Sequence, residues 1–268
     1  MERTRHGADP SSGTPDSDRH EGSVVQPGEW NVVKLPSSNI SPGHLLLIVA
    51  TLAGGLAVDV RTNIVGQSVL GIGAWAVLFG LLSRIEQPVR TGLILCLAIA
   101  TAGELFLSLV WGLYTYRLAN IPLFVPPGHV LLLLLGLWLA ERLPESVAGW
   151  IIGSAGLYSL AAAFAGLDTL GVALFAVLAV ASLAMPAQRR LFASTLVLAL
   201  ALELYGTWLG NWRWATEIPG LSLVTTNPPG VAGAFYCALD ALVAAASLQV
   251  VPRFVEWTAR TKAGMRAA

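Results

Sequence analysis

Two stretches of sequence share one pattern, and they decide how the rest of the chain is read. The first reads GELFLSLVWGLYTYRLANIPLFVPPGH over residues 103–129, and the second reads LELYGTWLGNWRWATEIPGLSLVTTNPPG over residues 202–230. Each has a glutamate inside an apolar run, followed by a hydroxyl, a glycine and two alternating aromatic residues. Each then contains an isolated proline and a Pro-Pro-Gly. We interpret them as two copies of an internal repeat and call them the first and second repeat stretch.

The composition around these stretches indicates a polytopic membrane protein. Of the 268 residues, 55% are hydrophobic and 12% are charged, whereas a soluble domain carries about 25% charged residues. Eight apolar segments approach the length of a bilayer crossing, and each should be helical because lipid offers no partners to backbone polar groups. They lie at 43–60, 64–83, 91–113, 128–143, 147–166, 168–185, 191–210 and 231–251. We therefore predict an all-α fold of about eight transmembrane helices.

The order of the segments predicts two membrane halves between two tails. Residues 1–40 and 253–268 are expected to form cytoplasmic tails, the first of them disordered because it is polar and lacks apolar periodicity. Residues 41–145 and 146–252 are expected to form two four-helix halves, related as parallel repeats because each holds an even number of spans. Thirteen of the 16 Lys and Arg residues fall on the side of the termini. This bias predicts a multi-pass cell-membrane protein with cytoplasmic termini and extracytoplasmic repeat loops.

Three acids inside apolar segments are the candidate catalytic residues. Glu104 and Glu203 belong to the two repeat stretches, and Asp240 lies near the middle of the last apolar segment. An acid at such a depth is costly and normally faces a bundle interior or a cavity. Burial favours the neutral form of a carboxyl, which can then donate a proton. The alternative is structural, with each acid tying neighbouring helices together.

Hydroxyl and imidazole groups near these acids are candidate supporting residues. Ser108 and Thr207 follow the two glutamates by four residues and share their helix faces. We expect each hydroxyl to bond the carboxyl and hold its orientation. His129 is a candidate proton shuttle, whereas a single histidine is a poor metal site. Phosphate-loop, zinc-protease and serine-hydrolase motifs are missing from the sequence, so we expect no metal and no cofactor.

Aromatic and cationic side chains of the repeat stretches are candidate substrate-binding groups. They are Trp111, Tyr114, Tyr116, Arg117, Trp208, Trp212, Arg213 and Trp214. In an extended segment, alternation puts both rings of each copy on one side, so the two copies would form an aromatic rim over the acids. Aromatic faces stabilise cations, which suits carbocation chemistry as well as binding of a quaternary amine or a sugar ring. Interfacial anchoring of the rings and solvation of the arginines are the alternatives.

One ordered set of residues in the first repeat stretch is shared with a known family. The set is Glu104, Gly112, Tyr114, Tyr116, Ile121, Pro122 and Leu123, and the second stretch echoes it with Trp in place of Tyr. In this order it resembles the integral membrane carotenoid-biosynthesis proteins that include carotenoid hydratases. The resemblance implies acid-assisted addition of water to, or cyclisation of, a long polyene.

Three classes of function stay open from the sequence. The first is a membrane enzyme that acts on a lipid or isoprenoid by carboxyl-assisted protonation, and the small size of the chain favours it slightly. The second is a proton-coupled transporter or small-molecule binding protein, because matched acids in two halves also suit alternating access. The third is a subunit of a membrane complex. The expected partners are membrane lipids and a hydrophobic small molecule, since a net charge of zero gives no electrostatic case for nucleic acid. The sequence does not define an oligomeric state.

Overall fold

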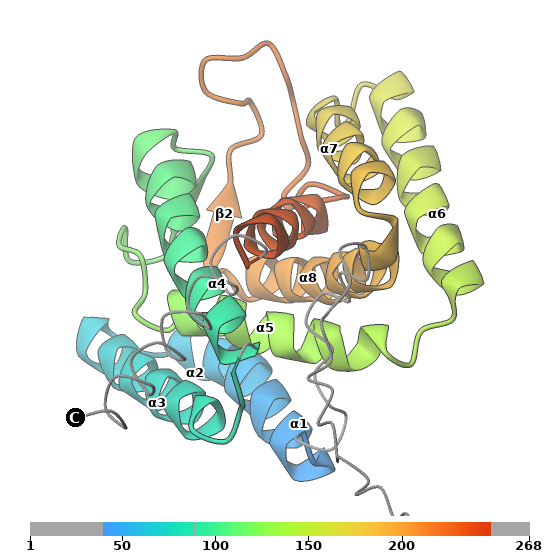
Figure 1. Cartoon of the computed structure of the whole chain (residues 1–268). Coiled ribbons are helices and arrows are strands. Elements are labelled where there is room, and N and C mark those ends of the chain that lie inside the picture. Colours follow the sequence, from blue (N-terminus) through green and yellow to red (C-terminus); the bar gives the residue numbers. More distant parts are fainter. Residues whose placement is uncertain (1–39, 88, 248–268) are drawn as a thin grey trace, which may run out of the picture. The chain divides into compact units, whose positions relative to one another are not determined.

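The computed structural model describes residues 40–87 and 89–247, which are mostly helical (Figure 1). The predicted tail 253–268, nearly all of the tail 1–40 and the end of the last apolar segment lie outside the described residues. Within the described part of the chain, every predicted apolar segment contains a helix. The all-α prediction is therefore confirmed, with one short two-stranded ribbon added to it.

The helices follow the predicted segments closely. The first segment is a helical rod in which a π-helical turn, η2 (Ala50–Gly54), separates α1 (Pro42–Val49) from α2 (Gly55–Asp59). A second π-helical turn, η3 (Leu105–Val110), extends α4 (Val89–Glu104). The other helices are α3 (Ile64–Leu82), α5 (Val125–Ala140), α6 (Glu145–Phe164), α7 (Leu170–Ala184), the 3₁₀ turn η4 (Pro186–Gln188), α8 (Arg189–Leu209) and the unlabelled helix Gly233–Ser247.

Several of these helices have the properties of membrane spans. Five are long and apolar enough to cross a membrane, namely Pro42–Asp59, Ile64–Leu82, Val89–Val110, Glu145–Phe164 and Pro186–Leu209. The apolar helices Val125–Ala140, Leu170–Ala184 and Gly233–Ser247 are shorter. Together they indicate a multi-pass membrane protein. The count of eight spans and the division into two four-helix halves stay predictions.

Glycines turn the chain from the acid-bearing helices into the ribbon. Gly112, with φ of 74°, follows η3, and Gly210, with φ of 86°, ends α8. Glycine takes this left-handed conformation without the steric penalty that a Cβ would impose. Each helical segment therefore ends at or just before its glycine, and a strand begins two residues after the glycine.

The two repeat stretches meet in this ribbon. Its strands β1 (Tyr114–Tyr116) and β2 (Trp212–Trp214) are antiparallel. The register pairs Tyr114 with Trp214, Thr115 with Arg213, and Tyr116 with Trp212. In each strand the two aromatic residues are buried and the middle residue is exposed, because successive side chains point to opposite faces. All four aromatic rings thus gather on one face, as the alternation predicts.

A buried polar network fastens the ribbon to the first two helices. Arg117, directly after β1, donates hydrogen bonds to the backbone oxygens of Asp59 at 2.6 Å and Thr62 at 2.9 Å. Its guanidinium also lies 3.5 Å from the Asp59 carboxylate. Asn211, directly before β2, donates to that carboxylate at 2.9 Å, and Gln67 of α3 donates to it at 3.0 Å. The buried Asp59 charge is therefore well satisfied, and both strands are held at one point.

The apolar core has two parts. One joins α1, α3, α4 and α5, and the other joins the ribbon to α7, α8 and the helix Gly233–Ser247. α5 packs against α8, α4 and α3, whereas α6 and α7 lie side by side (Figure 1). Both acid-bearing helices, α4 and α8, therefore contact α5.

Candidate functional site

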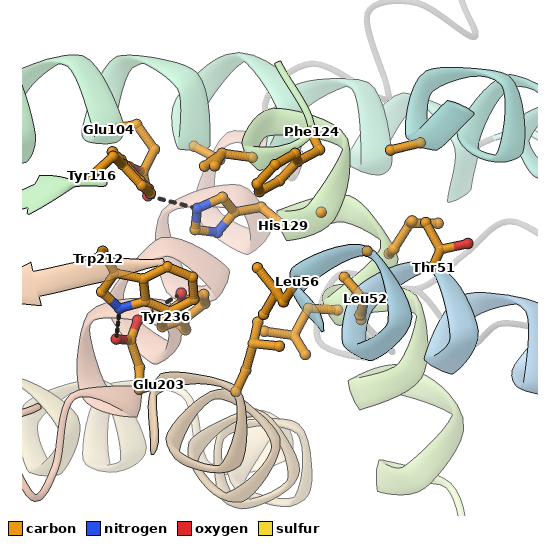
Figure 2. A pocket seen from close by; sticks show the side chains of 18 of the residues that line it. Thr51, Leu52, Leu56, Glu104, Tyr116, Phe124, His129, Glu203, Trp212 and Tyr236 are labelled. Carbon is orange, nitrogen blue, oxygen red and sulfur yellow. Dashed lines mark hydrogen bonds and ion pairs between the residues drawn. The ribbon is translucent and has the colours of Figure 1, made fainter. Parts of the chain in front are cut away.

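A cavity of about 680 Å³ is bounded on one side by the aromatic face of the ribbon. The turns η2 and η3, the helices α2 to α5 and α8, and the helix Gly233–Ser247 supply most of the rest of its wall. Most lining residues are apolar, and the polar ones other than Thr51 gather at the ribbon (Figure 2). These polar or hydrogen-bonding residues are Glu104, Tyr114, Tyr116, His129, Glu203, Trp212, Trp214 and Tyr236. Apolar pockets of this size with a few convergent polar groups are typical small-molecule sites.

Glu104, the last residue of α4, faces this polar end. Its Oε2 accepts hydrogen bonds from the phenol O–H groups of Tyr114 at 2.8 Å and Tyr116 at 2.7 Å. Its Oε1 lies 2.8 Å from Nε2 of His129, near the start of α5. Both carboxyl oxygens therefore contact groups that can donate. The π-helical turn η3 begins at the next residue, and such turns are frequent at functional sites.

Glu203 of α8 is held in a matching way by different donors. Its Oε2 accepts hydrogen bonds from the indole N–H groups of Trp212 at 2.7 Å and Trp214 at 2.9 Å. Its Oε1 accepts from the phenol O–H of Tyr236 at 3.0 Å. An indole nitrogen can only donate, so the oxygen that meets both indoles must act as an acceptor. The side chain is buried, and its three partners fix its position.

Two stacked rings lie between the acids. The imidazole of His129 stacks on the phenol ring of Tyr236, with centroids 5.0 Å apart and planes inclined by 29°. His129 contacts Glu104 and Tyr236 contacts Glu203, so the stack places the two carboxyls at one site (Figure 2). The Nδ1 atom of His129 is buried and lacks a hydrogen-bond partner among the described residues. The hydrogen-bonding capacity of this nitrogen is therefore unused by the described part of the protein.

The phenols of β1 are lasting hydrogen-bond donors. Burial, with the adjacent Glu104 carboxylate, raises the pKa of Tyr114 well above its ordinary value of 10.0. The same causes, in the same order, raise the pKa of Tyr116. A raised phenol pKa keeps the proton on the oxygen. Both hydrogen bonds to Glu104 therefore persist throughout the physiological pH range.

Four of the predicted substrate-binding residues do not line the cavity. Trp208 is 78% exposed on α8, and Arg213 is exposed on the outer face of the ribbon. Trp111 donates its indole N–H to the backbone oxygen of Pro219 at 2.8 Å. Arg117 belongs to the network around Asp59. The geometry gives these residues interfacial or anchoring positions.

The two hydroxyls predicted to orient the acids make other hydrogen bonds. Ser108 donates to the backbone oxygen of Tyr114 at 3.2 Å, and Thr207 donates to the backbone oxygen of Glu203 at 2.7 Å. A helical threonine readily bonds the carbonyl four residues earlier, and the carboxyls already have aromatic donors. The expectation of hydroxyl–carboxyl bonds is therefore wrong for both residues.

Asp240 is buried but lies outside the cavity lining. Its Oδ2 atom has no hydrogen-bond partner in the described part of the chain.

Cys96 and Cys237 are buried free thiols. Within residues 40–87 and 89–247, no three His, Cys, Asp or Glu side chains are arranged to hold a metal ion.

Sequence reasoning missed two features of the site. Tyr236, which completes the donors of Glu203, follows the second Pro-Pro-Gly, much as His129 follows the first. A search for a polar ring in both following helices would have found it. Asp59, the anchor of the ribbon, was also missed, although an acid at the end of an apolar segment before Arg61 gives little signal.

The site combines two buried carboxyls, an imidazole and aromatic faces at one end of an apolar cavity. A carboxyl–imidazole pair can hold and deliver a proton, and aromatic faces can stabilise a cation. No protein-family model, curated protein or solved structure matches this chain. The function is therefore argued from these groups and their geometry.

Proposed function

We propose that the protein is an integral membrane enzyme that protonates and hydrates a double bond of an isoprenoid or a similar long apolar lipid. The observation that carries the proposal is an apolar cavity with the Glu104–His129 pair and Glu203 at one end. A mainly hydrocarbon substrate fits such a lining, and its double bond can react with a delivered proton. The resemblance of the first repeat stretch to carotenoid hydratases supports the same chemistry.

In the proposed reaction, His129 delivers the proton. Glu104 stabilises the imidazolium through Nε2, and Nδ1–H donates its proton to one carbon of the double bond. The other carbon becomes a carbocation beside the rings of Tyr116 and Trp212, whose faces stabilise it. Water adds to this carbon, and Glu203 accepts the proton that water releases. The alkene and one water give an alcohol, and return of the proton to His129 restores the site.

The proposal is tested by product analysis of isosteric variants. Glu104→Gln and Glu203→Gln are expressed in a host that accumulates an acyclic polyene, and extracted lipids are examined by mass spectrometry for the gain of one water. Removal of a general acid or base lowers a rate by about 10²–10⁴-fold, so both variants should lose nearly all product. Glu141→Gln is the control, because Glu141 is exposed and outside the cavity lining. Wild-type product levels in both cavity variants would contradict the proposal.

A proton-coupled transporter is the second candidate, because both acids border one cavity. It predicts uptake of an unchanged polyene into reconstituted vesicles under a proton gradient, with loss of uptake in the same two glutamine variants. Chemical conversion without a gradient would favour the enzyme.

We also propose that the termini lie in the cytoplasm and the ribbon lies on the opposite side of the membrane. The excess of Lys and Arg on the side of the termini supports this orientation.

A further inference from the structure

Away from the ribbon, the cavity continues as an apolar arm. Figure 2 shows Leu56, Leu52 and Thr51 extending away from the polar side chains of Glu203 and Trp212. The arm's wall includes residues of both α3 and α4, namely Val69, Leu70, Gly73, Ala74, Val77, Ile99, Ala100 and Gly103. Apart from Glu104, Glu203 and His129 at the polar end, no Asp, Glu, Lys, Arg or His among the described residues lines the cavity. The arm thus offers its contents apolar contacts.

Several lining residues are also strongly exposed. Val58 of α2 is 49% exposed, Val69 of α3 is 62% exposed, and Phe106 of η3 is 53% exposed. A side chain that lines a cavity and is also exposed marks the rim of an opening. All three are apolar and belong to helical segments long and apolar enough to cross a membrane, so they suit an opening toward lipid.

Glycines keep the cavity wall thin in this region. A Cβ added to Gly54, Gly73 or Gly103 would meet no atom within 4 Å. These glycines therefore do not serve close helix packing, which is the usual reason for small residues in membrane helices. All three line the cavity, and their missing side chains add to its open space.

We propose that this opening is a lateral portal through which a long apolar chain enters from the bilayer. The reacting end of the chain reaches the carboxyls, and the following part lies along Gly54, Gly73 and Gly103. The identity of the chain as an isoprenoid or similar lipid rests on the proposed function. If each small group takes the ~30 Å³ of one liquid water, a cavity of 680 Å³ holds on the order of 20 heavy atoms. A longer substrate therefore extends through the portal into lipid while its end reacts.

Photolabelling tests the portal independently of catalysis. The full-length protein in lipid nanodiscs is irradiated with a diazirine-bearing 20-carbon isoprenol, and labelled residues are mapped by mass spectrometry. Gly73→Leu and Gly103→Leu place four extra carbon atoms in the arm from two different helices. Labelling of the cavity wall should fall about fivefold or more in each variant, because the added side chain occupies the volume that the probe needs.

Gly80→Leu is the matched control. Gly80 lies on α3, a Cβ there also meets no atom within 4 Å, and the residue does not line the cavity. Leucine is a better helix former than glycine, so none of the three substitutions should weaken its helix. Gly80→Leu should label like the wild type, and thermal melting confirms that each variant is folded.

The outcomes separate the portal from the chemistry. Wild-type labelling in folded Gly73→Leu and Gly103→Leu proteins would overturn the portal, even if Glu104→Gln and Glu203→Gln abolish conversion. Lost labelling in both glycine variants, with wild-type conversion in both glutamine variants, would support the portal and overturn the proposed chemistry. Equal loss of labelling in Gly80→Leu would also overturn the portal, because that side chain lies outside the cavity.

Discussion

Each buried carboxyl of the site is satisfied mainly by uncharged donors. Glu203 meets two indole N–H groups and one phenol, and Glu104 meets two phenols and an imidazole. Such donors stabilise an ionised carboxyl without a permanent ion pair.

The donors of Glu203 predict a large difference between two substitutions. Glu203→Ala leaves three buried donors without an acceptor, at about 1–3 kcal/mol each, so unfolding should become easier by roughly 3 kcal/mol or more. Glu203→Gln keeps an amide oxygen for the indoles and lets its N–H₂ donate to the oxygen of Tyr236, so its cost should stay below about 1.5 kcal/mol. Denaturant unfolding in detergent measures both. Equal losses would show that the indole–carboxyl bonds contribute little to stability.

The raised phenol pKa values predict a loss of stability in alkali. An unfolded chain ionises its tyrosines near pH 10, whereas the folded protein keeps Tyr114 and Tyr116 protonated. Above about pH 10 the unfolded state binds fewer protons, so stability falls as pH rises. The double variant Tyr114→Phe, Tyr116→Phe should be less stable near neutral pH, but its melting temperature should fall less steeply between about pH 9 and 11. If the melting temperatures of the wild type and the double variant fell equally steeply with pH, the raised pKa values of Tyr114 and Tyr116 would be refuted.

At the residue scale, the sequence locates the polar end of the site but not the direction of every side chain. Depth and repetition single out Glu104 and Glu203, and alternation correctly puts their aromatic neighbours on one face. Hydropathy cannot separate the exposed Trp208 of α8 from the buried Trp212 of β2, because it scores the type of a residue and not the direction of its side chain. Arg117 and Arg213 also differ in their positions. Arg213 is the middle residue of β2, whereas Arg117 directly follows the end of β1.

At the element scale, the ribbon depends on a close contact between α8 and β2. Gly206 of α8 lies so near Trp212 that a Cβ there would overlap the indole ring. That ring is buried and held by its hydrogen bond to Glu203, so it cannot move away freely. The glycine therefore allows the strand to lie across the helix that carries the acid.

We expect Gly206→Ala to displace Trp212 and weaken the site. The overlap should cost about 1–3 kcal/mol of unfolding free energy, more than the helix gains from alanine. Thermal melting and tryptophan fluorescence report the change. Gly149→Ala is the control, because a Cβ on this exposed glycine of α6 meets no atom within 4 Å. It should be neutral or stabilising by up to about 1 kcal/mol, and a similar loss at both positions would contradict the overlap.

Helix positions followed from hydropathy, but their internal irregularities did not. The apolar runs locate all the helices of the described chain within a few residues. The π-helical turns η2 and η3 arise from a local shift of backbone hydrogen bonds, which leaves the hydropathy pattern unchanged. Pairing of the two loops as one ribbon was also not predicted, because strand pairing between distant segments is a tertiary property.

At the scale of the whole molecule, the ribbon brings two distant segments to one cavity. The sequence predicted two matched loops on one side of the membrane, and the structure joins them strand to strand. Both glutamates line the same cavity. One substrate can therefore contact both acids.

The proposed orientation predicts opposite accessibility for two exposed serines. Ser222 lies in the loop after β2, and Ser146 lies at the start of α6. In intact cells, a membrane-impermeant maleimide should label Ser222→Cys, whereas Ser146→Cys should react only after permeabilisation. The native Cys96 and Cys237 are buried and should give little background. Labelling of Ser146→Cys in intact cells, with Ser222→Cys labelled only after permeabilisation, would contradict the proposed orientation.

The hydrogen-bond donors of Glu104 and Glu203 come from residues that follow each acid in the sequence, and this has a consequence for biosynthesis. Tyr114, Tyr116 and His129 all follow Glu104 within the first repeat stretch, and the donors of Glu203 likewise come from the segment just after it. A nascent chain can therefore supply hydrogen-bond donors to each acid from groups that leave the ribosome after it. The costly step of bringing a carboxyl into lipid need not wait for the other half of the protein. Two self-sufficient hairpins can insert in turn, and the strands join them once both have arrived.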